Sequence, residues 1–151
     1  MTRDAYIVEI LNFAISKEED SIQFYTYLAE TVDKPYMKEM FKQVASEEKG
    51  HRAKLEAVKK ERLLIPAAEK IMDLKISDYL VDIEPHPEMG YQEALIVAMK
   101  REKAAFKLYT DLSSAATDEN IKQLFLFLAL EEAKHKLRFE IEYDDTVLNE
   151  N

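Results

Sequence analysis

The chain has 151 residues and a formal net charge of −9, an acidic balance that would repel a polyphosphate backbone and argues against nucleic acid as a partner. It contains no cysteine, which excludes disulfides, zinc ribbons and thiolate nucleophiles and fits a reducing compartment. The first residues lack the basic start and apolar run of a signal peptide, and no stretch reaches the roughly 20 consecutive apolar residues of a membrane span, so we expect a cytoplasmic protein with no membrane partner.

A few long helices are predicted, because only two glycines and four prolines punctuate the chain. Apolar residues recur every three or four positions from about 4 to 31, which predicts an amphipathic helix capped by Thr2. Asp33 and Pro35 then interrupt the pattern, since aspartate caps helices and proline is tolerated in the first turn. A second helix is expected from about 35 to 63. Gly50 inside it costs about 1 kcal/mol relative to alanine, and its missing side chain leaves room for a close neighbour.

A crossover of about 64–90 follows the second helix. Pro66 can begin a short helix that runs to about Leu74, whereas Pro85 and Pro87 force extended backbone around His86, which we interpret as a surface residue. The segment between them is too apolar for a loose linker, so we expect it to pack on the bundle.

The second half of the chain repeats the first. A third helix, about 91 to 115, matches the first helix, and a fourth, about 118 to 147 with Thr117 as its cap, matches the second. Residues of the same type recur 84 positions apart in the two halves: Glu18 and Glu102, Tyr25 and Tyr109, Glu48 and Glu132, His51 and His135. We interpret this as a duplicated helical hairpin. Residues 1–151 are therefore predicted to form a single all-α domain, a four-helix bundle of two hairpins joined by one long crossover.

A glutamate and a histidine lie three residues apart in each repeat, at Glu48 and His51 and again at Glu132 and His135. On a helix such residues share a face and can reach one point in space. Residues equidistant from a hairpin turn lie side by side, so Glu18 is level with Glu48, roughly 22 Å from the turn. If the crossover traverses the bundle, the sets from the two hairpins meet at mid-bundle.

Two divalent cations would balance the four carboxylates of this set, which could not stay ionised and unpaired in an apolar core. The predicted metal ligands are Glu18, Glu48, His51, Glu102, Glu132 and His135. Each metal would take one terminal glutamate and one histidine, with Glu48 and Glu132 bridging both metals. Oxygen-rich ligation with one imidazole per metal suits iron or manganese, and zinc would bind by affinity alone. Glu47 and Glu131 are alternative ligands, because Glu47 also lies one turn from His51.

These residues resemble the rubrerythrin-like proteins of the ferritin-like di-iron carboxylate superfamily, in which two helices each give a glutamate and two others each give Glu-x-x-His. The matching segments are Ala14-x-x-x-Glu18, Glu48-x-x-His51, Ala98-x-x-x-Glu102 and Glu132-x-x-His135. The resemblance covers essentially the whole chain and implies a ferritin-like bundle with two iron ions.

The resemblance implies a non-haem di-iron oxidoreductase that reduces hydrogen peroxide or oxygen. The chain lacks a cysteine-rich rubredoxin module, so electrons would come from an external donor, a rubredoxin or a reductase. Peroxidase members carry a further glutamate where this chain has Ala105, which makes the site more like a bacterioferritin-type ferroxidase centre. A ferroxidase, iron storage or delivery protein is therefore the alternative function, and a metal-stabilised structural module or a hydroxylase are further hypotheses.

Two other features carry predictions. Tyr25 and Tyr109 lie seven residues after the terminal glutamates, so their phenols could hydrogen-bond a ligand carboxylate, or they could be ordinary core aromatics. The fourth helix is apolar nearly all round near Leu126, Phe127 and Leu130, which is typical of a helix buried on both sides. Either the crossover or a second copy would cover it, and we expect a homodimer.

Overall fold

The computed structural model describes residues 2–61, 74–81, 86 and 88–148. Within these residues the chain forms four long helices and no strand, which confirms the predicted all-α class. The long helices are α1 (Arg3–Thr31), α2 (Pro35–Lys60), α4 (Tyr91–Ala115) and α5 (Glu119–Tyr143). Two short elements accompany them: a 3₁₀ helix, η1 (Ile76–Tyr79), and a wider π turn, η2 (Asp144–Leu148), that continues α5.

In the first hairpin, the residues at the starts of the two helices agree with prediction at two of three positions. Thr2 caps α1, since its side-chain oxygen accepts a hydrogen bond from the amide of Ala5 at 3.2 Å. Pro35 occupies the first turn of α2. Asp33 is not the cap, because a proline at the first helical position places Lys34 in the capping position, and Lys34 makes no side-chain capping bond within the described residues.

The second hairpin differs from prediction at the start and the end of α5. Asp118, not Thr117, caps α5, because its carboxylate accepts a hydrogen bond from the amide of Ile121 at 3.0 Å. Threonine and aspartate are both good caps, so residue type alone did not separate them. The α-helical geometry ends at Tyr143, short of the predicted 147. α2 ends at Lys60, and the last predicted positions of that helix, 62 and 63, lie outside the described residues.

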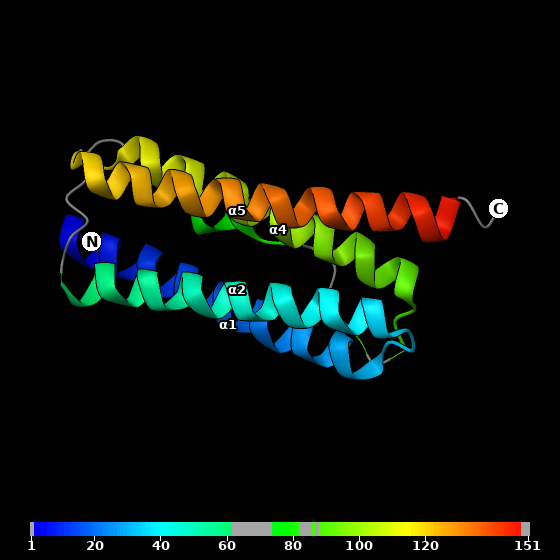
Figure 1. The fold of residues 1–151 in the computed structure, drawn as a ribbon. Helices are drawn as coiled ribbons and strands as arrows, with labels where there is room; N and C mark the ends of the chain where they lie inside the picture. Colours follow the sequence, from blue (N-terminus) through cyan, green and yellow to red (C-terminus); the bar gives the residue numbers. More distant parts are fainter. Residues whose placement is uncertain (1, 62–73, 82–85, 87, 149–151) are drawn as a thin grey trace.

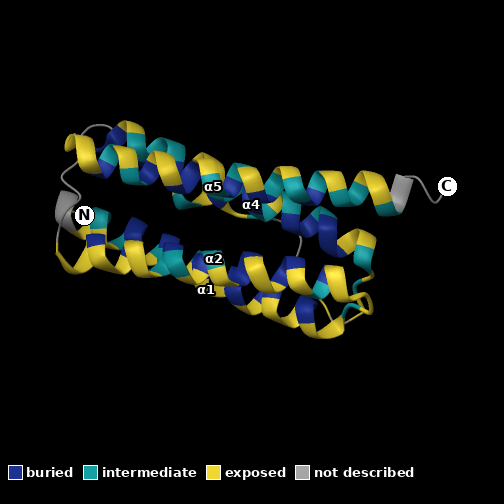
Figure 2. Cartoon of the chain, in the orientation of Figure 1, coloured by how far each residue is buried: buried dark blue, intermediate teal, exposed yellow. Residues whose placement is uncertain are grey.

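The helices pair as two hairpins, α1 with α2 and α4 with α5, which lie face to face along their length (Figure 1). The buried positions lie mainly on the faces turned toward the interior (Figure 2). In the described part of the chain the apolar core has two clusters, one toward each end of the bundle. One includes Leu11, Leu55, Leu112 and Phe125, and the other includes Tyr25, Phe41, Leu95 and Phe139. A band of buried polar residues lies between them.

The described part of the crossover packs on the bundle, as predicted. Tyr79 in η1 is buried, and its phenol donates a hydrogen bond to Asp111 of α4 at 2.8 Å. Tyr79 belongs to the core cluster that includes Leu11 and Phe125, and Leu74 and Ile76 pack against this cluster. The short helix predicted from Pro66 falls outside the described residues, as do the prolines at 85 and 87. His86 is exposed, in agreement with prediction, and its Nε2 lies 3.0 Å from Glu93.

Gly50 does not admit a close neighbour, contrary to the expectation from its position inside α2. A Cβ added there would meet no atom of the described residues within 4 Å. Space is therefore not the reason for a glycine at this point. None of the described helices is long and apolar enough to cross a bilayer.

Candidate metal centre

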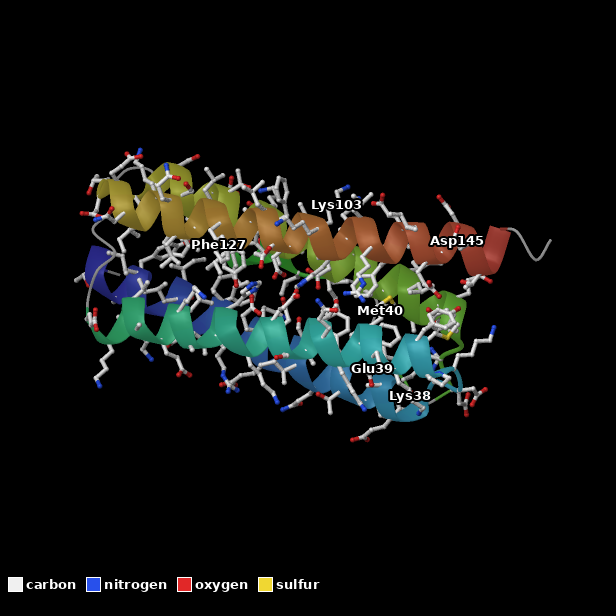
Figure 3. The ribbon with its side chains drawn as sticks, viewed as in Figure 1. Lys38, Glu39, Met40, Lys103, Phe127 and Asp145 are labelled. Carbon is white, nitrogen blue, oxygen red and sulfur yellow. The ribbon has the colours of Figure 1, made fainter. Side chains whose placement is uncertain are left out.

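All six residues predicted from the repeat meet in the polar band between the two apolar clusters. None of them is more than 3% exposed: Glu18, Glu48, His51, Glu102, Glu132 and His135. α1 and α4 each contribute one glutamate, whereas α2 and α5 each contribute a glutamate and a histidine. Side chains from both hairpins fill the space between them (Figure 3).

The potential ligand atoms form two overlapping groups within the described residues. One group joins Glu18 and His51 to the shared pair Glu48 and Glu132, and the other joins Glu102 and His135 to the same shared pair. In each group the ligand atoms all lie within 4.8 Å of one another. This is the arrangement expected for two adjacent metals. The structure adds that each terminal glutamate shares a group with the histidine of its own hairpin.

The imidazoles point their Nδ1 atoms into the cluster. Nδ1 of His51 lies 2.8 Å from Glu132 Oε1 and 3.2 Å from Glu48 Oε1. Nδ1 of His135 lies 3.2 Å from Glu48 Oε1 and 3.5 Å from Glu102 Oε2. The two rings stack with their centroids 6.0 Å apart. Both rings therefore present the same nitrogen to one compact set of carboxylates.

Although these atoms lie close together, each candidate ligand has one buried atom that makes no hydrogen bond of suitable geometry to the described residues. These atoms are Glu18 Oε2, Glu48 Oε1, His51 Nδ1, Glu102 Oε2, Glu132 Oε1 and His135 Nδ1. A buried polar atom without a partner costs about 1–3 kcal/mol, so six in one place call for a shared partner. Divalent cations satisfy oxygen and imidazole atoms together and balance the four carboxylates. The residues present therefore fit a pair of metal ions.

The electrostatics of the metal-free site show the same need for positive charge. Burial raises the pKa of Glu18 and Glu132, and neighbouring carboxylates raise both further. Burial also opposes ionisation of Glu48, but the imidazoles of His135 and His51 outweigh it and lower its pKa below the ordinary range. Burial lowers the pKa of His135, but the carboxylates of Glu102 and Glu48 raise it to about 11. The metal-free site therefore retains protons that a cation would displace.

The two tyrosines singled out from the sequence reach across to the opposite hairpin. The phenol of Tyr25 donates to Glu102 Oε1 at 2.6 Å, and that of Tyr109 donates to Glu18 Oε1. The hydrogen bond to a ligand carboxylate agrees with one of the two roles predicted for these tyrosines, but the sequence did not show which glutamate each would reach. Because α1 and α4 run antiparallel, each tyrosine lies level with the glutamate of the other helix. One oxygen of each terminal glutamate is thus held by a phenol, and the other faces the cluster.

Glu47 contacts the site from outside the cluster. The sequence did not show which of the two repeat copies, Glu47 or Glu131, would make such a contact. Nε2 of His135 donates a hydrogen bond to Glu47 Oε2, on the opposite side of the ring from the cluster. Such a carboxylate orients a ligand histidine and raises its basicity. Gln43 holds the other oxygen of Glu47 at 3.2 Å.

The repeat counterpart of Glu47 behaves differently. Glu131 forms an ion pair with Lys134, one turn along α5, at 3.4 Å. The residue that corresponds to Lys134 in α2 is Gly50, which has no side chain to hold Glu47. Glu47 is thus available to His135, whereas Glu131 is engaged on its own helix. This difference between positions 50 and 134 is the sequence signal that His135, but not His51, has a carboxylate partner outside the cluster among the described residues.

The fold and the cluster together define a ferritin-like four-helix bundle with buried glutamates and histidines that could hold metal ions. The rubrerythrin family profile matches residues 9–78 and 93–151, and the chain belongs to the rubrerythrin family. A hypothetical protein from Pyrococcus furiosus has the same fold, with a TM-score of 0.71 and 23% sequence identity over 95% of this chain and 89% of that chain. Curated proteins give no match.

Proposed function

We propose that this protein is a non-haem di-iron oxidoreductase that reduces hydrogen peroxide or oxygen with electrons from an external donor. The observation that carries the proposal is the convergence of six buried, unpartnered ligand atoms from four helices. Membership of the rubrerythrin family supports iron as the metal. Manganese and zinc are the alternatives that the same donor set would accept.

In the proposed site, Glu18 and His51 would hold one metal, Glu102 and His135 the other, and Glu48 and Glu132 would bridge both. Bound iron would supply the electrons that reduce the oxidant. Each terminal glutamate would bind through its free oxygen, because a phenol holds the other.

The tyrosines can keep this role over the whole physiological range of pH. Burial, followed by the nearby carboxylates, raises the pKa of Tyr25 and Tyr109 well above the ordinary value, so both phenols stay protonated and continue to donate. Apolar clusters at either end of the bundle keep water from entering along its axis. The chain thus fixes the ligands and closes the two ends of the bundle around them.

The electron donor belongs to the proposal as well. The chain contains no cysteine, so it has no thiolate-ligated iron centre of its own to relay electrons. A rubredoxin or a reductase would supply them. The cytoplasmic location expected from the sequence stays a prediction.

The test is anaerobic loading of the metal-free protein with Fe²⁺, followed by hydrogen peroxide and oxygen in parallel. We expect oxidation of the bound iron faster than that of Fe²⁺ in buffer by at least one oxidant, and loss of this acceleration in the Glu48→Gln, Glu132→Gln double variant. A loaded wild-type protein whose iron oxidises no faster than free Fe²⁺ would refute the proposal.

A second candidate function, ferroxidase with iron storage or delivery, is favoured by Ala105. This small residue lies one turn after Glu102 and adds no fifth carboxylate to the cluster. Iron uptake discriminates between the two functions. Two tightly held irons per chain that cycle with an external donor support the oxidoreductase, whereas uptake of many irons per chain supports storage.

We also propose that a second copy of the chain covers the outer face of α5. A stripe of apolar side chains on this helix is 41–56% exposed in the single chain: Leu126, Leu130, Leu137 and Ile141. The described part of the crossover packs on α4 instead. Phe127 lies apart from the stripe, with Lys54 Nζ of α2 over its ring at 5.5 Å (Figure 3). Sedimentation should show a dimer that a Leu130→Glu, Leu137→Glu variant disrupts, and a wild-type monomer at micromolar concentration would refute it.

A further inference from the structure

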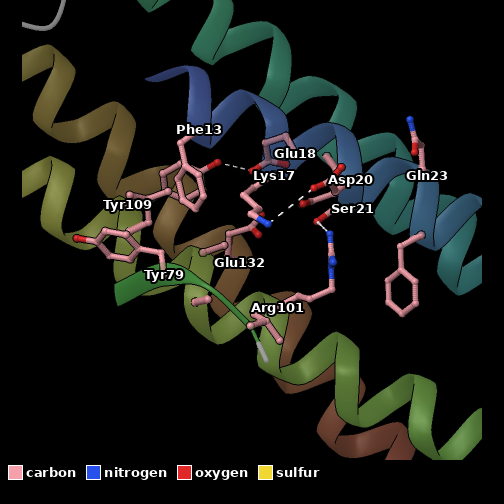
Figure 4. Close-up of a pocket in the computed structure, with 16 residues that line it drawn as sticks. Phe13, Lys17, Glu18, Asp20, Ser21, Gln23, Tyr79, Arg101, Tyr109 and Glu132 are labelled. Carbon is pink, nitrogen blue, oxygen red and sulfur yellow. Dashed lines mark hydrogen bonds and ion pairs between the residues drawn. The ribbon is translucent and has the colours of Figure 1, made fainter. Parts of the chain in front are cut away.

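A cavity of about 360 Å³ lies beside the cluster of candidate metal ligands, between α1, α4 and the crossover (Figure 4). Three candidate ligands line it, Glu18, Glu48 and Glu132, so whatever enters can reach the metal position. A water molecule occupies about 30 Å³, so the cavity far exceeds what peroxide or oxygen needs. Its volume is in the range of pockets that bind small organic molecules.

Part of the wall that α4 contributes is formed by small apolar residues. Ala104 and Ala105 line the cavity, with Leu108 one turn further along and Phe13 opposite on α1. Ala105 lies one turn from Glu102, on the side where a longer residue would fill the space next to the cluster. The cavity therefore offers an apolar surface directly next to the carboxylates.

Arg101 supplies a cation to the same cavity. Its guanidinium donates a hydrogen bond to the hydroxyl of Ser21 at 3.2 Å and lies 5.3 Å from the ring centroid of Phe24 (Figure 4). Its Nε is buried without a partner, and no carboxylate of the described residues forms an ion pair with it. The other cation in the lining, Lys17, is already paired with Asp20 at 3.8 Å.

A guanidinium held by one neutral hydroxyl retains donors in the planar fork that matches a carboxylate. An apolar wall beside it suits a short hydrocarbon body. We propose that the cavity binds a small organic carboxylate, with its charged end on Arg101 and its apolar body against Ala104 and Ala105. This rests on the proposed function in one respect: two bound metals must offset the four cluster carboxylates before an anion can approach.

Zinc-loaded protein tests the proposal without any redox step. Hexanoate is the probe, hexanol supplies the same body without the charge, and acetate supplies the charge without the body. Calorimetry should show hexanoate binding at least tenfold more tightly than either comparison compound, and metal-free protein should bind it more weakly than zinc-loaded protein. Equal binding of hexanoate and hexanol, or equal binding with and without zinc, would overturn the assignment.

Three variants locate the binding. Arg101→Gln should weaken hexanoate binding at least tenfold and leave hexanol unchanged, and Ala105→Phe should weaken both by filling the cavity. Lys103→Gln makes the same charge change on α4 outside the cavity lining and should bind hexanoate like wild type. Zinc stoichiometry checks that each variant retains the metal site. Equal effects of Arg101→Gln and Lys103→Gln would refute the role of Arg101.

The outcome is independent of the test of the oxidoreductase. Iron-loaded protein that fails to react with peroxide or oxygen refutes the proposed activity while hexanoate still binds to zinc-loaded protein. Conversely, if hexanoate fails to bind as proposed, the iron-loaded protein can still react with peroxide or oxygen.

Discussion

Replacing Glu47 with glutamine should weaken one metal position and leave the other unchanged. The carboxylate accepts a hydrogen bond from Nε2 of His135, and Nδ1 of the same ring faces the cluster. A glutamine keeps the size of the side chain but removes the negative charge that makes the imidazole a better ligand. Loss of such a partner typically costs 10–100-fold in metal affinity.

The position of Glu47 sets the expected size of the effect. Its side chain is 34% exposed, so water screens part of the interaction. We therefore expect the lower end of the range, about tenfold, or about 1.4 kcal/mol. Titration of the metal-free protein with Co²⁺ against a competing chelator should resolve two binding steps, and only the step assigned to His135 should weaken.

Glu131→Gln is the matched control. Glu131 is the repeat counterpart of Glu47, but it is paired with Lys134 and not with His51. The substitution should change either metal-binding constant by less than about twofold, because Glu131 pairs with Lys134, which is not a candidate ligand. Equal losses in the two variants, or an effect of Glu47→Gln on both metal positions, would refute the inferred inequality of the two halves.

Three further predictions concern stability and protonation. Tyr25→Phe leaves Glu102 Oε1 buried without its donor, so urea unfolding of the metal-free protein should show a loss of about 1–3 kcal/mol, and no loss would contradict that bond. Gly50→Ala should raise the free energy of unfolding by about 0.5–1 kcal/mol, because the added methyl meets open space in a helix interior, and a decrease would show a neighbour that is absent from the described residues. Burial raises the pKa of Glu18 and the cluster carboxylates raise that of His135, so the folded metal-free chain keeps protons that the unfolded chain loses above about 4.5 and 6.5. Its thermal stability should therefore fall from pH 5 to pH 8 while metal affinity rises, and metal affinity that is flat across this range would contradict the displaced protons.

The six clustered residues were predictable from the sequence because two constraints coincided. Helical periodicity placed Glu48 and His51 on one face, and the 84-residue repeat supplied a second copy at the same height in its hairpin. A single Glu-x-x-His is common in a helical chain rich in glutamate, so one copy alone would have been weak evidence. The scarcity of glycine and proline likewise settled the class of fold, and the third helix was predicted with the bounds that the structure shows.

The features that sequence reasoning missed depend on contacts between the hairpins. The sequence indicated that Tyr25 could hydrogen-bond a ligand carboxylate but not which one, and the antiparallel packing of α1 and α4 brings it to Glu102. The cavity beside Ala105 is likewise lined by residues of all four long helices and of the crossover. Such contacts depend on the offset between elements far apart in the chain, which periodicity within one helix does not determine. Only the unequal roles of Glu47 and Glu131 could have been read from the local sequence, because Gly50 stands in α2 where α5 has Lys134.

The central claim is that these six residues hold two metal ions, and metal stoichiometry tests it most directly. Metal-free protein titrated anaerobically with Fe²⁺ should bind two ions per chain. The Glu48→Gln, Glu132→Gln double variant removes both shared carboxylates and should bind neither tightly. Binding of two ions by wild type and double variant alike, or binding of none by wild type, would contradict the account.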